Sequence, residues 1–152
     1  MSLEQGILAK YRTIAVVGLT ANPARPSHYV SAYMRDQGYR IIPINPAEDE
    51  VFGLKAYPDL ASVPDAIELV DVFRRPEFCA EVARAAVAAG AKALWLQSGI
   101  TSEEARLIAE GAGLSYVEDR CVMVEHRRAG LGPVGQSSLP PLAKGKGPTP
   151  LG

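Results

Sequence analysis

The sequence predicts an α/β domain in which a doubly wound, mainly parallel sheet of about five strands carries helices on both faces. Short apolar, β-branched runs alternate with stretches of helical periodicity along the first 128 residues. The chain has 152 residues and is 47% hydrophobic, which suits one domain with a core of its own. The first strand ends at a glycine and a Pro-rich loop that leads into a helix, and helix N-termini in that position bind anions.

The first elements follow from their apolar patterns. Residues 1–12 carry apolar side chains at helical spacing, which predicts a small amphipathic helix over an edge of the sheet. Thr13–Val17 is the first predicted strand, and Val30, Tyr33 and Met34 predict the helix that follows. Gly38 is expected to stop this helix, and residues 39–44 form the second predicted strand. Pro43 indicates that one side of the second strand is unpaired or distorted.

The middle of the chain begins with a connection and continues with a strand and a helix. Residues 47–64 are acidic and rich in turn residues, so we expect a surface crossover with at most a short helix. Residues 69–73 form a buried third strand. Pro76 is expected at the first position of the next helix, whose apolar stripe includes Phe78 and Val82 and which stops at Gly90.

The last predicted elements are less regular. Residues 93–96 form the fourth strand, and Thr101 and Glu104 have capping-box spacing for a helix through Ala109. Residues 115–118 form the fifth strand. Residues 121–126 are interpreted as one more extended segment or as the end of the domain at its surface. We expect residues 1–128 to form the domain and residues 129–152 a disordered or loosely attached tail, because 11 of these 24 are Gly or Pro.

Composition excludes several classes of function. The formal net charge of -1 argues against binding to nucleic acid or to a membrane surface. The two cysteines, Cys79 and Cys121, and the two histidines are widely spaced, so no metal site is expected. No signal peptide or membrane span is recognisable, and we expect a cytoplasmic protein.

The ends of the predicted strands indicate where a ligand binds, because ligands of such Rossmann-like sheets lie outside the carboxyl ends of the strands. The first loop keeps only Gly18 of the dinucleotide fingerprint, so it is not a standard NAD loop. Arg25 supplies a guanidinium where the first long helix begins. Ser27 is either the N-cap of that helix or a hydroxyl that contacts phosphate.

The end of the second strand discriminates between nucleotides. An NAD site favours Asp or Glu there for the ribose hydroxyl, whereas this chain has the neutral Asn45. Asn45 does not repel a phosphorylated ribose, and Arg25, Arg74 or Arg75 can pair with phosphate. The alternative is structural: Asn45 makes the turn before Pro46, and the arginines are solvated.

Five separated motifs together resemble a known family. The chain is similar to the small bacterial and archaeal CoA-binding proteins over roughly residues 5 to 128, and to the N-terminal CoA-binding domain of the succinyl-CoA synthetase α subunit. The motifs, in order, are VGLTANPARPSHYVSAYM, GYRIIPINP, VDVFRRPE, AKALWLQSGI and EDRCVMVEHRR.

The resemblance implies a single Rossmann-type domain that holds coenzyme A or an acyl-CoA. Its phosphates would lie at the loop from Gly18 to Ser27, its adenosine near the second and third strand ends, and its pantetheine arm towards the fourth. The residues assigned to the ligand on this basis are Gly18, Leu19, Thr20, Arg25, Ser27, Asn45, Pro46, Val72, Phe73, Arg74, Gln97, Gly99 and Ile100.

We expect no catalysis, since the synthetase requires a second domain with a phosphorylatable histidine that His28 and His126 do not replace. The expected function is therefore a carrier, sensor or regulatory module, with CoA as ligand and a protein partner or a second copy left open. The alternatives are an NAD(P)-binding redox protein and a detached subunit of an acyl-CoA synthetase. Cys121 is either an inert side chain of the core or a thiol that could form a mixed disulfide with CoA.

Overall fold

The computed structural model describes residues 1–134, and within them the predicted architecture is confirmed. Five parallel strands form one sheet in the order β2-β1-β5-β6-β7, and β3 and β4 form a small antiparallel ribbon beside it. The strands are β1 Thr13–Val17, β2 Arg40–Ile44, β3 Glu50–Val51, β4 Leu54–Lys55, β5 Leu69–Val72, β6 Ala93–Leu96 and β7 Ser115–Val117. The helices are α1 Leu3–Lys10, α2 Pro26–Asp36, α3 Cys79–Ala88, α4 Glu103–Gly111 and α5 Val122–Ala129, with short 3₁₀ turns at Leu60–Ser62 and Pro76–Phe78.

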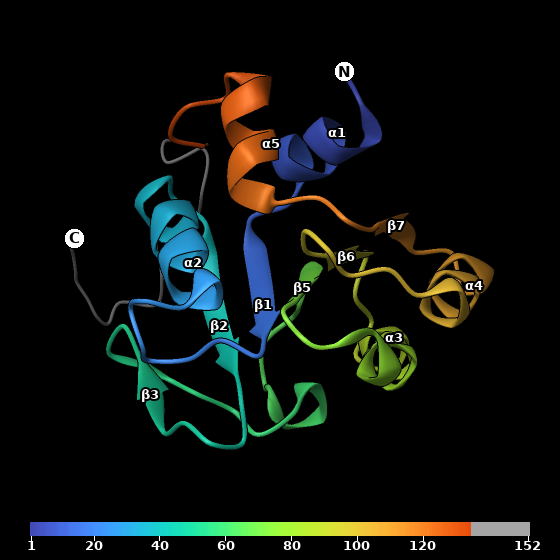
Figure 1. Ribbon diagram of the computed structural model, residues 1–152, viewed down its shortest axis with the longest axis horizontal. Coiled ribbons are helices and arrows are strands. Elements are labelled where there is room, and N and C mark those ends of the chain that lie inside the picture. Colours follow the sequence, from blue (N-terminus) through green and yellow to red (C-terminus); the bar gives the residue numbers. More distant parts are fainter. Residues whose placement is uncertain (135–152) are drawn as a thin grey trace.

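Helices cover both faces of the sheet, as Figure 1 shows. We call the side covered by α1, α2 and α5 the cleft face, and the opposite side the α3–α4 face. Alternate residues of each strand point to opposite faces, as the pleat requires. In β5, for example, Leu69 packs with the core of the cleft face and Val70 with the core of the α3–α4 face. The sheet therefore separates two apolar cores.

The second strand lies at an edge of the sheet, which explains how it tolerates a proline. Pro43 pairs in register with Val16 of β1, and no strand within residues 1–134 pairs with its other side. Its carbonyl accepts a hydrogen bond from the Tyr57 N–H at 3.0 Å. The missing N–H of Pro43 therefore disrupts no ladder between two strands.

Two helix starts differ from the sequence prediction, and α4 runs to Gly111 instead of ending at Ala109. The N-cap of α4 is Ser102, whose hydroxyl accepts from the Ala105 N–H at 3.1 Å, so the cap lies one residue after the predicted Thr101. Ahead of α3, Pro76 and Phe78 belong to the 3₁₀ turn, so Pro76 is not the first residue of the helix as predicted. These differences are shifts of a boundary within an element of the predicted type.

The segment after Cys121 is a helix, so the prediction of a further extended segment there was wrong. Val122, Glu125 and His126 are buried at positions i, i+3 and i+4, which is helical periodicity. The neighbouring apolar residues Met123 and Val124 obscured this spacing in the sequence. Gly130, with φ of 64°, ends the helix in the left-handed conformation.

The beginning of the predicted tail packs on the domain. The Val134 side chain is buried, and its N–H donates to the Gln37 carbonyl at 2.7 Å. Residues 135–152, the remainder of that tail, lie outside the described residues.

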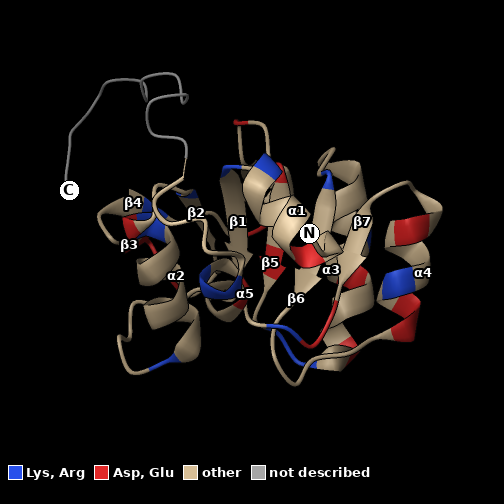
Figure 2. Ribbon diagram, turned by 90° about the horizontal axis from the view of Figure 1, so that it is seen from above, with Lys and Arg blue, Asp and Glu red and all other residues tan. Residues whose placement is uncertain are grey.

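Charges of both signs lie on the outside of the molecule, and α4 carries bands of each in Figure 2. On that helix Arg106 contacts Glu103 at 2.6 Å and Glu110 at 2.8 Å. Such exposed pairs contribute little to stability. Over residues 1–134, no helix combines the length and the apolar character that crossing a bilayer requires.

Candidate functional site

Two cavities open at the carboxyl ends of the strands. The larger one, here called the main cleft, has a volume of about 710 Å³ and lies between the N-terminal ends of α2 and α5. The smaller one, called the side cavity, has a volume of about 530 Å³ and lies against α3 and the end of β2. Gly18, Phe73 and Arg74 line both cavities. The two cavities therefore adjoin at these three residues, which we call their junction.

This junction is the topological switch point of the sheet. From β1 the chain first moves to β2 on one side and later returns to β5 on the other side. Gly18 follows β1 directly, and Phe73 follows β5 directly. Crevices at such points are where open α/β sheets bind their ligands.

Gly18 is required by the close approach of these two strand ends. Its φ is +92°, and a Cβ at this position would lie 2.5 Å from the Phe73 carbonyl oxygen. The Gly18 N–H donates to the Ile44 carbonyl at 2.9 Å, so it is already used within the protein. The role of Gly18 is thus to bring the strand ends together rather than to donate to an anion.

Most other backbone amides of the loop are also satisfied internally. The Thr20 N–H donates to the Ser27 hydroxyl at 3.3 Å, and the Ala21 N–H donates to the Glu48 carboxylate at 2.8 Å. The Asn22 N–H donates to the Thr20 hydroxyl at 3.0 Å. A ligand bound here would therefore rely on side chains and on the free end of α2 more than on the loop backbone.

Ser27 is not the N-cap of α2, which corrects one of its two predicted roles. The helix begins at Pro26, and no side chain among residues 1–134 caps it. Ser27 is buried and its hydroxyl holds the loop through Thr20. Pro26 has no N–H, and the His28 N–H donates to the Arg25 carbonyl at 2.9 Å, so the Ser27 N–H is the first-turn amide that no hydrogen bond within residues 1–134 uses. Because the first residues of α2 line the main cleft, the positive end of the helix dipole faces it.

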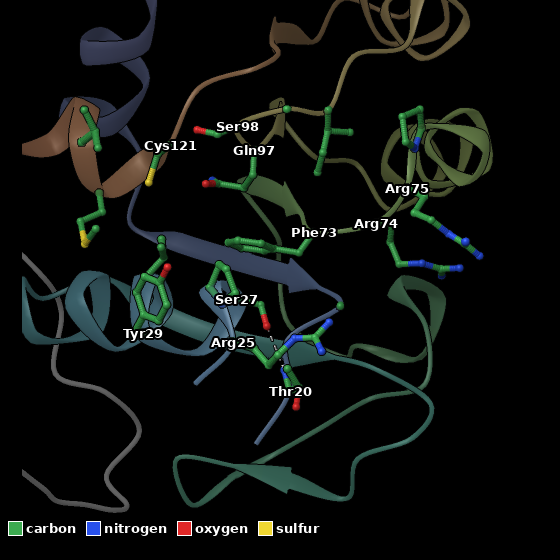
Figure 3. Close-up of a pocket in the computed structure, with 18 residues that line it drawn as sticks. Thr20, Arg25, Ser27, Tyr29, Phe73, Arg74, Arg75, Gln97, Ser98 and Cys121 are labelled. Atoms are coloured by element: carbon green, nitrogen blue, oxygen red, sulfur yellow. Dashed lines mark hydrogen bonds between the residues drawn. The ribbon is translucent and has the colours of Figure 1, made fainter. Parts of the chain in front are cut away.

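Two arginines border the site without a carboxylate partner within residues 1–134. Arg25 lies at the start of α2, and Arg74 lies at the end of β5 with its guanidinium 4.2 Å from the centre of the Phe78 ring. Figure 3 shows both on the same side of the site. Arg75, by contrast, points to Glu77 at 3.6 Å and is exposed. Arg25 and Arg74 therefore supply positive charge that a ligand can neutralise.

Asn45 joins the end of β2 to the first loop. Its Nδ2 donates to the Leu19 carbonyl at 3.0 Å, and its Oδ1 accepts from the Ala47 N–H at 2.9 Å. Both ends of the carboxamide thus have partners inside the protein, and the residue lines the side cavity. The turn-forming role of Asn45 is directly visible in these contacts.

Eleven of the thirteen predicted ligand residues line one or both cavities. Leu19 and Val72 are the exceptions, because their side chains are fully buried in the core. Thr20, Arg25, Ser27, Gln97, Gly99 and Ile100 line the main cleft only, Asn45 and Pro46 line the side cavity only, and Gly18, Phe73 and Arg74 line both. The structure therefore brings together residues that are far apart in the sequence.

Sequence reasoning missed one wall of the main cleft. Met123 and Val124 line it from the first turn of α5, and Tyr29 lines it from α2. The α5 residues were missed because that segment was not recognised as a helix. The helical spacing of Val122, Glu125 and His126 was the signal that could have identified it.

A buried carboxyl group beneath the main cleft was also missed. Asp71 is 1% exposed in the central strand β5 and accepts a hydrogen bond from Gln97 Nε2 at 2.6 Å. Burial raises the pKa of Asp71 from 3.8 to about 7, and the bonds from Gln97 and from the Val72 backbone oppose this rise. An acid inside an otherwise apolar strand was the available signal.

The cysteines and histidines differ in burial and in their hydrogen-bond partners. Cys121 lines the main cleft as an unpaired thiol, whereas Cys79 is buried, and burial raises the pKa of its thiol to about 11. His126 is 1% exposed and lies between the Tyr33 hydroxyl and the Gly132 carbonyl. His28 contacts the Thr20 carbonyl at 2.9 Å. Among residues 1–134 no group of three or more His, Cys, Asp or Glu side chains could hold a metal ion.

Known proteins resemble the chain in sequence and in structure. An uncharacterised protein of Bacillus subtilis, YneT, is 42% identical over 79% of this chain and 89% of its own length. A hypothetical protein from Pyrococcus horikoshii superposes with a TM-score of 0.81 at 40% identity, covering 83% of this chain and 89% of the other. The α subunit of acetate–CoA ligase (ADP-forming) II from Pyrococcus furiosus is 26% identical over 79% of this chain, which spans 29% of that subunit.

The family described as "CoA binding domain" matches residues 12–127, a range that contains every strand of the sheet and both cavities. The chain is homologous to the CoA-binding domain of the ADP-forming acetate–CoA ligases and of proteins like succinyl-CoA synthetase. The five motifs had indicated the synthetase, and the relation to the acetate–CoA ligases comes from the comparison. With its Rossmann-like sheet and its site at the switch point, the chain belongs to the CoA-binding domain family.

Proposed function

We propose that this protein is a cytoplasmic, non-catalytic module that binds coenzyme A or an acyl-CoA as carrier, sensor or regulator. The observation that carries the proposal is the junction of the two cavities at Gly18, Phe73 and Arg74. A ligand with two dissimilar ends and phosphates between them suits two cavities that join beside positive charge. Membership of the CoA-binding domain family supports the same ligand.

In this proposal the adenosine end occupies the side cavity, near Asn45 and Pro46. The phosphates lie between Arg25 and Arg74, close to the open end of α2. The pantetheine arm follows the main cleft towards Gln97, Gly99 and Ile100. The volume of the main cleft, about 710 Å³, falls in the range of small-molecule sites.

The non-catalytic part of the proposal is supported by how the histidines are held. His126 is enclosed by two hydrogen-bond partners, and burial lowers its pKa, which favours the neutral ring. His28 is occupied with the Thr20 carbonyl. Neither histidine lines either cavity, so neither is positioned to receive a phosphoryl group there.

A second candidate function rests on one comparison. Because a relative is named as the α subunit of a ligase, the chain is alternatively the CoA-binding subunit of an acyl-CoA synthetase whose partner supplies the nucleotide site. This alternative predicts that a second protein co-purifies with the chain and that the pair forms acyl-CoA from CoA, a carboxylic acid and ATP. The first candidate predicts no product from the isolated chain.

Thermal-shift titrations with CoA and with NAD test the proposal, because a ligand that binds only the native state raises the apparent stability. We expect CoA to give the larger shift. A larger shift with NAD, or none with CoA, would contradict it. A parallel titration with 3′-dephospho-CoA, which lacks the phosphate on the ribose, tests whether that phosphate is recognised, and equal affinities would show that it is not.

A further inference from the structure

The carboxamide of Gln97 lies at the floor of the main cleft and is held from below. Gln97 follows β6, is 4% exposed and lines the cleft. Its Nε2 donates to Asp71 Oδ1 at 2.6 Å, and Asp71 lies one strand away in β5 with 1% exposure. In Figure 3 the carboxamide extends towards the side of Cys121. A buried hydrogen bond of this length leaves the amide little freedom.

The other end of the carboxamide has no partner within residues 1–134. None of their hydrogen bonds ends on Gln97 Oε1. Only Arg12 Nε and Ser31 Oγ are both enclosed and without a partner among the described side-chain atoms, so Gln97 Oε1 keeps contact with the cleft. A nine-tenths buried side chain thus presents one acceptor to the space where a ligand would lie.

We propose that Asp71 is a positioning residue that turns Gln97 Oε1 towards the cleft, so that the site selects a ligand segment carrying an amide N–H. The inference rests on the proposed function, because the pantetheine arm of CoA carries two such N–H groups. Asp71 does not line either cavity and acts only through Gln97.

The chemistry of the two side chains explains the selection. An ionised carboxylate can only accept hydrogen bonds, so Gln97 must offer it the NH₂ group and direct the oxygen away. A protonated Asp71 can also donate, and then either orientation of the carboxamide is satisfied. With the pKa of Asp71 near 7, the amide is held in one orientation above neutrality and released below it.

Within residues 1–134, the causes of the raised pKa of Asp71 are burial and two hydrogen bonds, and no charged side chain is among them. The neighbouring strands place Val16 and Trp95 opposite Asp71. The nearby titratable groups of α2 and α5 have other hydrogen-bond partners: His28 contacts the Thr20 carbonyl, Tyr33 contacts His126, His126 also contacts the Gly132 carbonyl, and Glu125 accepts from Arg128. Cys121 lines the main cleft. All five groups are retained in an Asp71→Asn variant. Any pH effect on binding that comes from them rather than from Asp71 therefore persists in that variant.

The test compares two ligands at two pH values by calorimetry. CoA carries the pantetheine arm, whereas adenosine 3′,5′-bisphosphate lacks it, so the ratio of the CoA affinity to the bisphosphate affinity reports on the arm. The 5′-phosphate of the bisphosphate is a monoester whose second pKa is about 6, unlike the diphosphate of CoA, so the pH dependence of the ratio is compared between the parent and Asp71→Asn. Relative to the variant, we expect the ratio of the parent chain to fall by about fivefold from pH 8 to pH 6, since a single hydrogen bond is lost. In Asp71→Asn, whose amide permits both orientations of Gln97, the ratio should be low and should lack this fall.

A double-variant cycle separates positioning from a structural role. Gln97→Met removes the acceptor and should lower CoA affinity by a similar factor without changing the affinity for the bisphosphate. Adding Asp71→Asn to Gln97→Met should then have no further effect on CoA. An Asp71→Asn effect that persists in the Gln97→Met background, or that is equal for the two ligands, overturns the inference.

Failure of the proposed function can be distinguished from failure of the role of Asp71 in the same binding measurements. If the proposed function is wrong, the parent chain binds neither CoA nor the bisphosphate at either pH, and both proposals fall together. If the parent binds CoA and its affinity ratio changes with pH to the same extent as that of Asp71→Asn, only the role of Asp71 is wrong. If Asp71→Asn fails to fold, Gln97→Met, which lacks the acceptor, serves as the reference in its place.

Discussion

The two faces of the sheet are built differently, although the same strands contribute to both. The core of the α3–α4 face consists of apolar side chains, with small residues such as Ala83 and Ala86 where α3 meets the sheet. Among residues 1–134, the buried Ser, Asp, Gln, Glu and His side chains lie in α2, in α5, in β5 or directly after β6, on the cleft face: Ser27, Ser31, Asp71, Gln97, Glu125 and His126. Because unpaired buried polar groups are costly, their gathering on one face indicates that recognition is built there and packing on the other.

The largest effect is expected when a carboxyl group is placed in β5 on the α3–α4 face instead of the cleft face. Val70 and Asp71 are neighbours that face opposite cores and are both almost fully buried. Val70→Asp places a carboxyl group on the α3–α4 face with no partner, and it should destabilise the fold by more than about 4 kcal/mol. Circular dichroism with urea unfolding measures this. A folded variant with nearly the parent stability would show that the α3–α4 face tolerates charge as well as the cleft face does.

The pH dependence of stability should come from the cleft face through Asp71. Its pKa is raised from 3.8 to about 7 in the folded protein, so its contribution to stability is complete below about pH 4 and is lost as the pH rises through 7. Asp71→Asn removes this loss and should be more stable than the parent at pH 8 by roughly 2–4 kcal/mol, at about 1.4 kcal/mol per pH unit.

Urea unfolding of the parent and of Asp71→Asn at pH 5 and pH 8 measures the effect. Taking the difference between the two proteins cancels the opposite contribution of His126, whose lowered pKa makes its stabilisation decline at acidic pH. A difference in unfolding free energy that does not grow between pH 5 and pH 8 would contradict the assignment to Asp71.

Ligand affinity should depend on the arginines of the site and not on those of the α3–α4 face. Arg25→Ala or Arg74→Ala should weaken CoA binding by about tenfold to a hundredfold, because a hydrogen bond to a charged group contributes roughly 1.5–3 kcal/mol. Arg84→Ala is the matched control, since Arg84 is an exposed arginine of α3 that lies 3.7 Å from Glu104 of α4. Calorimetry measures the affinities. Binding within twofold of the parent in both site variants would mean that the arginines do not hold the phosphates.

The smallest expected effect concerns stability without binding. Ser102 caps α4 through the Ala105 N–H, and Ser102→Ala should cost about 1 kcal/mol of stability while leaving CoA affinity unchanged. Chemical denaturation and calorimetry on the same sample check both parts. A loss of CoA affinity in this variant would show that the two faces are coupled.

The sequence was sufficient for elements whose pattern is local. Thr13–Val17 and Ala93–Leu96 are apolar runs between turn residues, and they form β1 and β6 within the predicted bounds. Gly18 was recognised as a turn residue, but its contact with the Phe73 carbonyl joins residues 55 positions apart and has no local signature.

The polar side of the site shows the same limit. The bond between Asp71 and Gln97 spans 26 residues, so neither side chain indicates the other in the sequence. The loop amides of Thr20 and Ala21 are occupied by Ser27 and Glu48, contacts that follow from tertiary packing rather than from composition. The sequence could predict which residues gather around the two cavities. It could not predict which of these residues already have hydrogen-bond partners within the protein.

The junction of the two cavities at Gly18, Phe73 and Arg74 has a consequence for how binding strength arises. If each cavity holds one half of a ligand, the covalent bond between the halves makes the second contact intramolecular, at an effective concentration in the millimolar range or above. Separate adenosine and pantetheine fragments gain nothing from this link, whatever their total concentration. Two weak sites thereby behave as one strong site only towards a molecule long enough to pass the junction.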